Sequence, residues 1–442
     1  MAREMRHSGI EWIGEIPKEW KTCRLKGIAH SLIKGNGITK EEVFPDGDTP
    51  CVRYGEIYSK YNGAFVECKS KTRKDILSST RYFDYGDILF AGTGELVEEI
   101  GKNIVYLGEL SCLAGGDIII LKHGQNPVFL NYALNSQYAQ SQKSCGKAKL
   151  KVVHISSSEI GDLQVILPPL SEQQKIANYL DKVCREVDEM IALQEQMIEE
   201  LKAYKQSVIT EAVTKGLNPN VSMRDSGIDW IGDVPEHWKL VPLKYCFGRR
   251  SEKNNPVKTK ERLSLSIDKG VTLYAEKTTN LDRFKDDFTQ YQLAYPNDIV
   301  LNCMNMIVGA VGLSKYMGCV SPVYYVIYPI RPDIDALYYS FLLNIPTIRG
   351  VYFSLGKGIY AIERGEGRVN TCRLKVSYDD FGRLDIPIPP IDEQKEITEF
   401  IQDKCAEIDA LIAIKQAKIE ELKDYKKSVI YEYVTGKKEV LN

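Results

Sequence analysis

The stretch from Pro168 to Thr214 reads PPLSEQQKIANYLDKVCREVDEMIALQEQMIEELKAYKQSVITEAVT. It returns 221 residues later, from Pro389 to Thr435, as PPIDEQKEITEFIQDKCAEIDALIAIKQAKIEELKDYKKSVIYEYVT. Beyond its opening prolines neither copy contains Pro or Gly, which predicts one continuous α-helix each. At 1.5 Å per residue each helix is about 65 Å long, too long for one helix of a compact domain of this size.

Local signals mark the ends of these helices. We place the first at 171–214, with Ser171 as N-cap and Gln174 completing a capping box. Gly216 and Pro219 are its stop signals. The second is expected to begin at Asp392 and to end at Gly436.

Both helices share one stripe with alternating steps of four and three residues, which predicts a coiled-coil seam. The polar seam positions Gln194/Lys415 and Lys205/Lys426 recur at equivalent places, as register-setting residues do. If the halves are related by a pseudo-two-fold axis, the two helices pair antiparallel. The apolar helix–helix and partner-docking candidates on the stripe are Leu180, Val187, Ile191, Ile198, Leu201, Val208, Ile401, Ile408, Ile412, Ile419, Leu422 and Val429.

A second row on the first helix contains Met190 and Met197, between Val183 and Tyr204. Its counterpart on the second helix is Lys404, Leu411, Lys418 and Tyr425. A Met-rich surface suits a partner protein. Packing of this row against the chain's own globular parts is an equally open reading.

A shorter repeat opens each half of the chain. Residues 5–26 read MRHSGIEWIGEIPKEWKTCRLK, and residues 223–244 read MRDSGIDWIGDVPEHWKLVPLK. We expect the tryptophans, Trp12 and Trp20 with Trp230 and Trp238, to pack the start of each domain rather than to contact a ligand.

The stretches between the repeats show no visible likeness to each other. Their short β-type runs and turn signals predict mixed globular domains, so the fold class is α+β with two long antiparallel helices. The expected strands lie at 104–106, 117–121, 298–301 and 323–328, and the expected helices near 127–142 and 335–343. We divide the chain into domain 1–167, helix 168–214, domain 215–388, and helix with tail 389–442. The repeated segments are alike in both halves, whereas the stretches between them differ. This arrangement suits a protein that recognises two different targets at a fixed separation.

The charge is unevenly distributed along the chain. The net charge is −2, yet segments 171–214 and 391–435 carry −4 each, which leaves +6 on the rest. A net positive region suits a phosphate backbone, although the excess is modest.

Basic and aromatic residues gather in the expected loops of both domains, where Lys suits phosphates and Arg or Asn can read base edges. Arg249 and Lys375 lie in the same clusters as the residues we select. The selected DNA-binding candidates are Lys34, Asn36, Arg53, Tyr54, Lys60, Lys147, Lys149 and Lys151 in the first domain, with Arg250, Lys253, Asn255, Lys258, Lys357, Arg364, Arg368 and Arg373 in the second.

The sequence shows no catalytic motif. It has no phosphate-binding loop, no HExxH, no GxSxG, and no Asn-Pro-Pro-aromatic motif of adenine methyltransferases. The 11 cysteines and five histidines lack metal spacing, so we expect no metal, no cofactor and reduced thiols. No membrane span or signal peptide is recognisable. The sequence leaves a nuclease site built from scattered carboxylates as an alternative.

GIEWIGEIPKEW at 9–20, GIDWIGDVPEHW at 227–238, PPLSEQQKIA at 168–177 and PPIDEQKEIT at 389–398 resemble the specificity subunit of type I restriction-modification systems, the HsdS family. IEELKxYKxSVI in both helices belongs to the same likeness, which covers nearly the whole chain. The resemblance implies two target recognition domains, each reading half of a split, asymmetric site in double-stranded DNA, with helices that set the spacer.

The same resemblance implies partners that carry the chemistry. Two methyltransferase subunits, using S-adenosylmethionine for adenine N6 methylation, would dock on the helices. Restriction subunits, using ATP and Mg²⁺, would join them, and this chain would be non-catalytic and cytoplasmic in a prokaryote. The alternatives are a coiled-coil scaffold without DNA specificity, and a stand-alone nuclease or methyltransferase.

Overall fold

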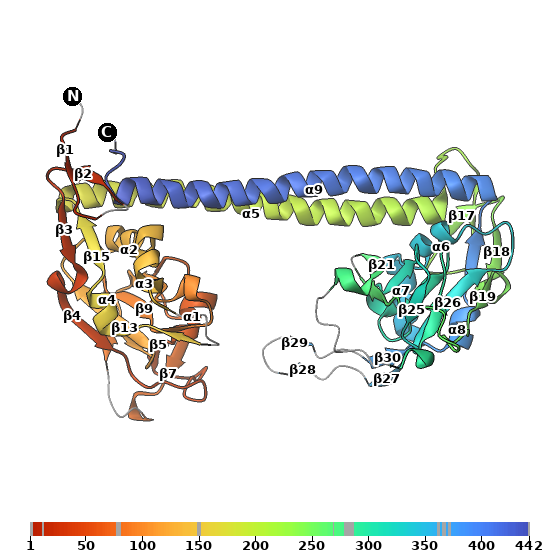
Figure 1. Ribbon diagram of the computed structural model, residues 1–442, viewed down its shortest axis with the longest axis horizontal. Coiled ribbons are helices and arrows are strands. Elements are labelled where there is room, and N and C mark those ends of the chain that lie inside the picture. The colour runs from red at the N-terminus through yellow and green to blue at the C-terminus, as the bar shows by residue number, and fades with distance from the viewer. Residues whose placement is uncertain are drawn as a thin grey trace. The chain divides into compact units, whose positions relative to one another are not determined.

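The computed structural model describes residues 3–10, 13–76, 81–147, 152–267, 269–277, 287–359, 363–364, 368–369 and 373–440. The chain forms two compact units, Met1–Glu195 with Gln416–Asn442 (unit 1) and Gln196–Lys415 (unit 2). Each unit holds an α+β globular domain and one stretch of each long helix (Figure 1). The predicted fold class is confirmed.

The two long helices are α5 (Leu170–Lys215) and α9 (Ile391–Val434), of 46 and 44 residues. Each begins one residue earlier than predicted, so Ser171 and Asp392 lie in the first turn and are not N-caps. The reason is the preceding proline: the Pro169 carbonyl accepts from the amide N–H groups of Glu172 and Gln173, at 2.9 Å each. The predicted stops are correct, since Gly216 and Gly436 take the left-handed φ values of +76° and +72° that favour glycine after a helix.

Unit 1 is built on two sheets. The strand order of the larger sheet is β4-β13-β9-β11-β6, and that of the smaller is β7-β5-β12-β8, with β5 parallel to β12. The strands are β4 (Ala29–Lys34), β13 (Ile118–His123), β9 (Ile88–Ala91), β11 (Asn103–Tyr106), β6 (Ala64–Phe65), β7 (Ser70–Thr72), β5 (Thr49–Val52), β12 (Cys112–Ala114) and β8 (Tyr82–Phe83).

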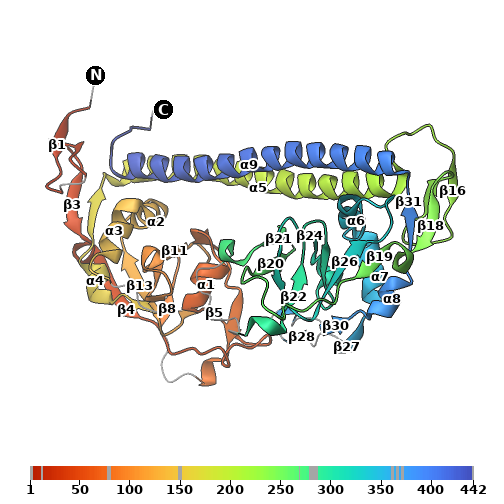
Figure 2. The same ribbon diagram turned by 45° about the vertical axis from the view of Figure 1, so that its right-hand side comes forward.

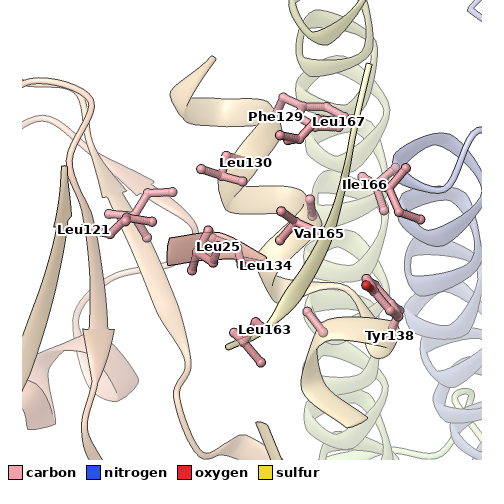
Figure 3. Packing of buried hydrophobic residues seen from close by; sticks show 14 of the residues in the cluster. Leu25, Leu121, Phe129, Leu130, Leu134, Tyr138, Leu163, Val165, Ile166 and Leu167 are labelled. Carbon is pink, nitrogen blue, oxygen red and sulfur yellow. The ribbon is translucent and has the colours of Figure 1, made fainter. Parts of the chain in front are cut away.

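The larger sheet is covered on both faces. Alternate residues of β13 point to opposite sides, so Ile119 and Leu121 join the cluster under α2 (Pro127–Asn135) and α3 (Gln137–Ser144). Ile118 and Ile120 join a second cluster with α1 (Tyr54–Ser59). Figure 3 shows Leu121 facing Leu130 and Leu134 of α2. This core holds the domain against the start of α5.

Unit 2 repeats this topology, which the sequence did not reveal. Its largest sheet has the order β19-β26-β23-β24, matching β4-β13-β9-β11 strand for strand, with all neighbours antiparallel in both. Figure 2 shows β19 and β26 of this sheet side by side. An isolated parallel bridge, Arg262 to Cys319, stands where β5 pairs with β12 in unit 1. The strands are β19 (Phe247–Arg249), β26 (Tyr324–Pro329), β23 (Ile299–Asn302), β24 (Val311–Leu313), β20 (Leu263–Ser266), β21 (Gly270–Leu273), β22 (Gln292–Ala294) and β25 (Gly318–Val320).

The short elements predicted from sequence coincide with β11, β13, β23 and β26, and the helix expected at 335–343 is α6 (Ala336–Leu342). The helical structure expected near 127–142 is confirmed, in two helices rather than one. It divides into α2 and α3 at Ser136, whose extended backbone ends one helix and whose hydroxyl accepts from the Ala139 amide to cap the next. The helix α7 (Pro346–Leu355) is the corresponding second helix of unit 2.

The opening repeats connect each domain to a long helix in the same way. In unit 1 β1 (Met5–His7) pairs with β2 (Glu15–Pro17), and β3 (Lys21–Arg24) pairs with β15 (Gln164–Leu167) just before α5. In unit 2 β16 (Met223–Asp225) pairs with β17 (Asp233–Pro235), and β18 (Lys239–Pro242) pairs with β31 (Asp385–Ile388) just before α9. Each opening segment therefore pairs with the strand that leads into a long helix.

Candidate nucleic-acid interface and docking helices

A buried tryptophan ties each opening segment to a long helix. The Trp20 Nε1 donates to the Glu172 carboxylate at 3.0 Å, and the Trp238 Nε1 donates to the Glu393 carboxylate at 3.0 Å. Both indoles are buried, as expected for a packing role, whereas Trp12 lies outside the described residues. The Trp and the Glu of the repeated motifs therefore make the same contact in both units.

The glutamine after each of these glutamates makes a second contact with the domain. The Gln173 side chain donates to the Pro168 carbonyl at 2.9 Å and accepts from the Asn126 amide, which precedes α2, at 2.9 Å. The Gln394 side chain donates to the Pro389 carbonyl and accepts from the Asp335 amide, which precedes α6, both at 2.8 Å. Both glutamines are buried, so each domain is fixed to its helix by a satisfied polar contact.

Two equivalent ion pairs join the long helices. Lys426 contacts Asp188 at 2.6 Å in unit 1, and Lys205 contacts Asp409 at 2.7 Å in unit 2. In unit 1, moreover, Tyr179 stacks near Tyr433 with ring centroids 4.5 Å apart. Along each unit's contacts between the helices, the residue numbers rise in α5 and fall in α9. The helices are therefore antiparallel, as predicted. The predicted polar seam positions Lys205 and Lys426 thus each meet a carboxylate of the other helix.

The predicted seam follows the burial of the two helices. Leu180, Val187, Ile198, Ile401, Ile408, Ile419, Leu422 and Val429 are buried, and Ile191, Leu201, Val208 and Ile412 are half-buried. Leu180 shares a cluster with Val429 in unit 1, and Ala212 shares one with Ile401 in unit 2. The seam residues therefore form the contact between the helices.

Three exposed, large apolar side chains recur at repeat-equivalent positions of the long helices in the two units. In unit 1 they are Met190, Leu193 and Tyr425, and in unit 2 their repeat equivalents Leu411, Ile414 and Tyr204. Their exposed fractions range from 44% for Met190 to 64% for Ile414. We call these sets the unit 1 and unit 2 apolar triads. Met197, the other candidate of this row, is half-buried.

A basic loop occupies the same topological place in both domains. In unit 1 it runs from α3 to α4 (Ser157–Gly161), and Lys147 pairs with Glu159. In unit 2 it runs from α7 to α8 (Tyr378–Gly382), and Lys357 contacts Asp380 at 3.5 Å. Hydrogen bonds from the Ser377 hydroxyl and the nearby Lys357 charge lower the pKa of Asp380. The two carboxylates lie 221 positions apart, as the helix repeats do.

The remaining candidates of the two basic loops differ in what the structure describes of them. Lys149 and Lys151 lie outside the described residues. Arg364, Arg368 and Arg373 fall in β28 (Glu363–Arg364), β29 (Arg368–Val369) and β30 (Arg373–Lys375), and β30 pairs with β27 (Lys357–Ile359).

Several selected candidates are engaged within the fold. Asn36 is 2% exposed, and its amide donates to the carbonyls of Arg81 and Ala114. The Arg250 guanidinium makes a bidentate contact with the buried Asp298 at 2.6 and 2.9 Å. These two side chains hold loops in place, and their polar groups are engaged there rather than presented to a base. Lys60 pairs with the buried Glu56 at 2.7 Å while remaining half-exposed.

Other candidates lie on the surface. Lys34, Tyr54, Lys253, Asn255 and Lys258 are exposed, although Lys258 pairs with Glu252. Arg53 is half-buried, and its Nε finds no hydrogen-bond partner among the described residues. Two residues that were not selected, Arg249 and Lys375, line a surface pocket with Lys357. Nothing in the sequence separates Arg249 from its neighbour Arg250.

The described residues hold no cluster of His, Cys, Asp and Glu that fits a metal ion. Among the same residues, no helix combines the length and the apolarity of a membrane span.

Comparison with known proteins agrees with this architecture. Residues 17–203 match the family described as type I restriction modification DNA specificity domain. The chain is 25% identical to the type I restriction enzyme MjaVIII specificity subunit of Methanocaldococcus jannaschii, over 97% of this chain and 95% of that protein. It is 22% identical to the EcoDI specificity subunit of Escherichia coli, over 90% of this chain and 84% of that protein.

Solved structures share the fold. A chain from a study of complex assembly and conformational transition of the type I R-M system has a TM-score of 0.68 at 16% identity, covering 95% of this chain and 99% of that one. The HsdS subunit of Thermoanaerobacter tengcongensis has a TM-score of 0.52 at 15% identity, covering 95% and 98%. The matched domain and the full-length relatives together make this chain similar to the specificity subunits of type I restriction-modification systems, and the solved structures share its fold.

Proposed function

We propose that this chain is the sequence-specific DNA-binding subunit of a type I restriction-modification complex, with target recognition domains at 1–167 and 215–388. Each domain reads one half of a bipartite, asymmetric site in double-stranded DNA, and the long helices set the spacer between the halves. The observation that carries this proposal is that two domains of unlike sequence share one topology. Each is attached to a long helix through the same Trp–Glu contact. Unlike loops on one scaffold are what two different half-sites require.

The basic loops support this reading. Both domains place lysines between the same pair of helices, and the charge outside the long helices is positive. Such a surface attracts the DNA backbone, and its loops can reach base edges. The candidates that are exposed are Lys34, Tyr54, Lys60, Lys253, Asn255, Lys258 and Lys357, whereas Lys147 is half-buried and paired with Glu159.

The apolar triads support docking of two copies of one partner, which we take to be methyltransferase subunits. The same three kinds of side chain recur at repeat-equivalent positions, once in each unit, and each set is exposed. An exposed apolar cluster rimmed by charges is typical of a protein interface.

In this proposal the chain binds no cofactor and works in the cytoplasm. Adenine N6 methylation from S-adenosylmethionine belongs to the methyltransferase partners. Restriction, with ATP and Mg²⁺, belongs to further subunits. Since the partner must extrude the adenine to methylate it, this chain has to hold the duplex firmly.

An adenine-methylation map of host DNA tests the proposal, compared with and without this chain. We expect loss of one split motif when the chain is deleted. Replacing residues 1–167 by the corresponding domain of another family member should change one half-site only. A change in both halves, or a motif that survives deletion, would contradict the proposal.

A further inference from the structure

A surface pocket of about 440 Å³ in unit 2 gathers three cationic side chains. Its cations come from β19, β27 and β30, while two tyrosines from β26 and α8 supply the walls. The lining residues are Arg249, Tyr325, Lys357, Lys375, Ser377, Tyr378 and Asp379.

Arg249 is held by aromatic rings rather than by a carboxylate. Its guanidinium lies over the Tyr325 ring at 5.1 Å and the Tyr378 ring at 4.8 Å. Stacking fixes the guanidinium plane but leaves its N–H groups at the edge for an acceptor. Arg249 is exposed, and its guanidinium forms no hydrogen bond or ion pair with the described residues, in contrast to the paired guanidinium of Arg250.

The two lysines oppose each other. Lys357 and Lys375 are direct cross-strand partners of the β27–β30 pair. Like charges in that position repel and destabilise the strand pair. Among the described residues Asp379 is the one carboxylate of the lining, and Asp380 lies 3.5 Å from the Lys357 Nζ. The cations outnumber these two carboxylates, so an anion from outside would stabilise the pocket.

We propose that Arg249, Lys357 and Lys375 form a clamp for a phosphodiester group of the DNA backbone, an inference that rests on the proposed function. A phosphodiester has two non-bridging oxygens that share one negative charge, and each oxygen can accept more than one hydrogen bond, so one planar arginine and two lysine point charges can share them. A guanine edge offers two acceptors and is satisfied by one arginine. A phosphate contact fixes the position of the domain on the duplex and carries no sequence information directly.

Salt dependence of DNA binding tests the clamp. The complex of this chain with its methyltransferase partners would be titrated on a duplex carrying the mapped target and on a scrambled duplex. The double variant R249Q/K375Q removes two charges from the pocket. The three cations hold one phosphate, and each lost phosphate contact lowers the magnitude of the slope of log affinity against log salt by about 0.9, so we expect a fall of about 0.9. The ratio of target to scrambled binding should stay unchanged, and R249K should retain the slope.

The matched control is K239Q/K315Q, which removes two exposed lysines of unit 2 that do not line the pocket. Thermal melting shows whether each variant is folded. Equal slopes for control and pocket variants would overturn the clamp, as would relaxed discrimination at one base with an unchanged slope. A wild-type complex without salt-dependent DNA binding would overturn the proposed function as well, so the two failures are distinguishable.

Discussion

Lys143 places a buried amine against three oxygen atoms in unit 1. It is 1% exposed, and its Nζ donates to the Gly101 carbonyl and the Leu134 carbonyl at 2.7 Å and to the Asn103 side chain at 2.9 Å. Burial lowers the pKa of Lys143 to about 7. The side chain therefore joins α3 to the loop before β11 rather than adding charge to the basic surface.

This burial predicts a pH-dependent stability. The folded-state pKa lies below the ordinary value of 10.5, so between pH 7 and about 10 the unfolded chain binds the extra proton. Stability relative to a Lys143→Met variant should then rise across this window, by up to about 1.4 kcal/mol per pH unit. Urea unfolding of both proteins at pH 7 and pH 9 measures the difference. A difference that does not change with pH would mean that the three acceptors hold the ammonium form.

Single residues were the least predictable part of the candidate site. Composition singles out Arg249 and Arg250 alike, yet Asp298 engages only the second. Asn36 resembles a base-reading residue in sequence, but its amide satisfies backbone groups of two neighbouring segments. Such distinctions depend on contacts across 45 or more positions, which no local pattern carries.

At the scale of elements, the long helices were predictable because their burial is periodic. A seam with steps of four and three residues in a segment free of Pro and Gly predicts a long α-helix and no other element. The strands of the domains were harder. β9 and β12, which were not predicted, are buried at every position, so they lack the alternation that marks a half-exposed strand. The shared topology of the domains was therefore hidden, since it lies in strand pairing rather than in residue identity.

The apolar triads predict how partners add to the helices. Met190→Asp should weaken docking at unit 1, and Leu411→Asp should weaken docking at unit 2. Loss of one buried aliphatic contact costs about 1.5–3 kcal/mol, or about tenfold or more in affinity. Native mass spectrometry of the purified complex should show one methyltransferase subunit with either variant and none with the double variant.

Ala413→Asp provides the matched control for this experiment. It adds the same charge at an exposed position beside Ile414, rotated about 100° around the helix. It should retain two partner subunits. Full occupancy in the double triad variant would mean that the partners dock elsewhere on the chain.

For the whole molecule, the two long helices are the elements shared by both units. Helix α5 passes from unit 1 to unit 2 at Glu195, and α9 passes back at Lys415. Because Asp188–Lys426 and Lys205–Asp409 are repeat-equivalent, a change made equally in both helices keeps the seam and both ion pairs. The spacer of the DNA site should therefore respond to helix length alone.

Inserting seven residues after Glu195 and seven after Lys415 tests this. One heptad keeps the seam in phase and adds about 10 Å to each helix. At 3.4 Å per base pair the spacer should lengthen by up to about three base pairs, with both half-sites unchanged. The methylation map of cells carrying the variant reads spacer and half-sites together. Insertion in α5 alone breaks the antiparallel register, so it should abolish methylation, and an unchanged spacer in the double insertion would refute the helices as the ruler.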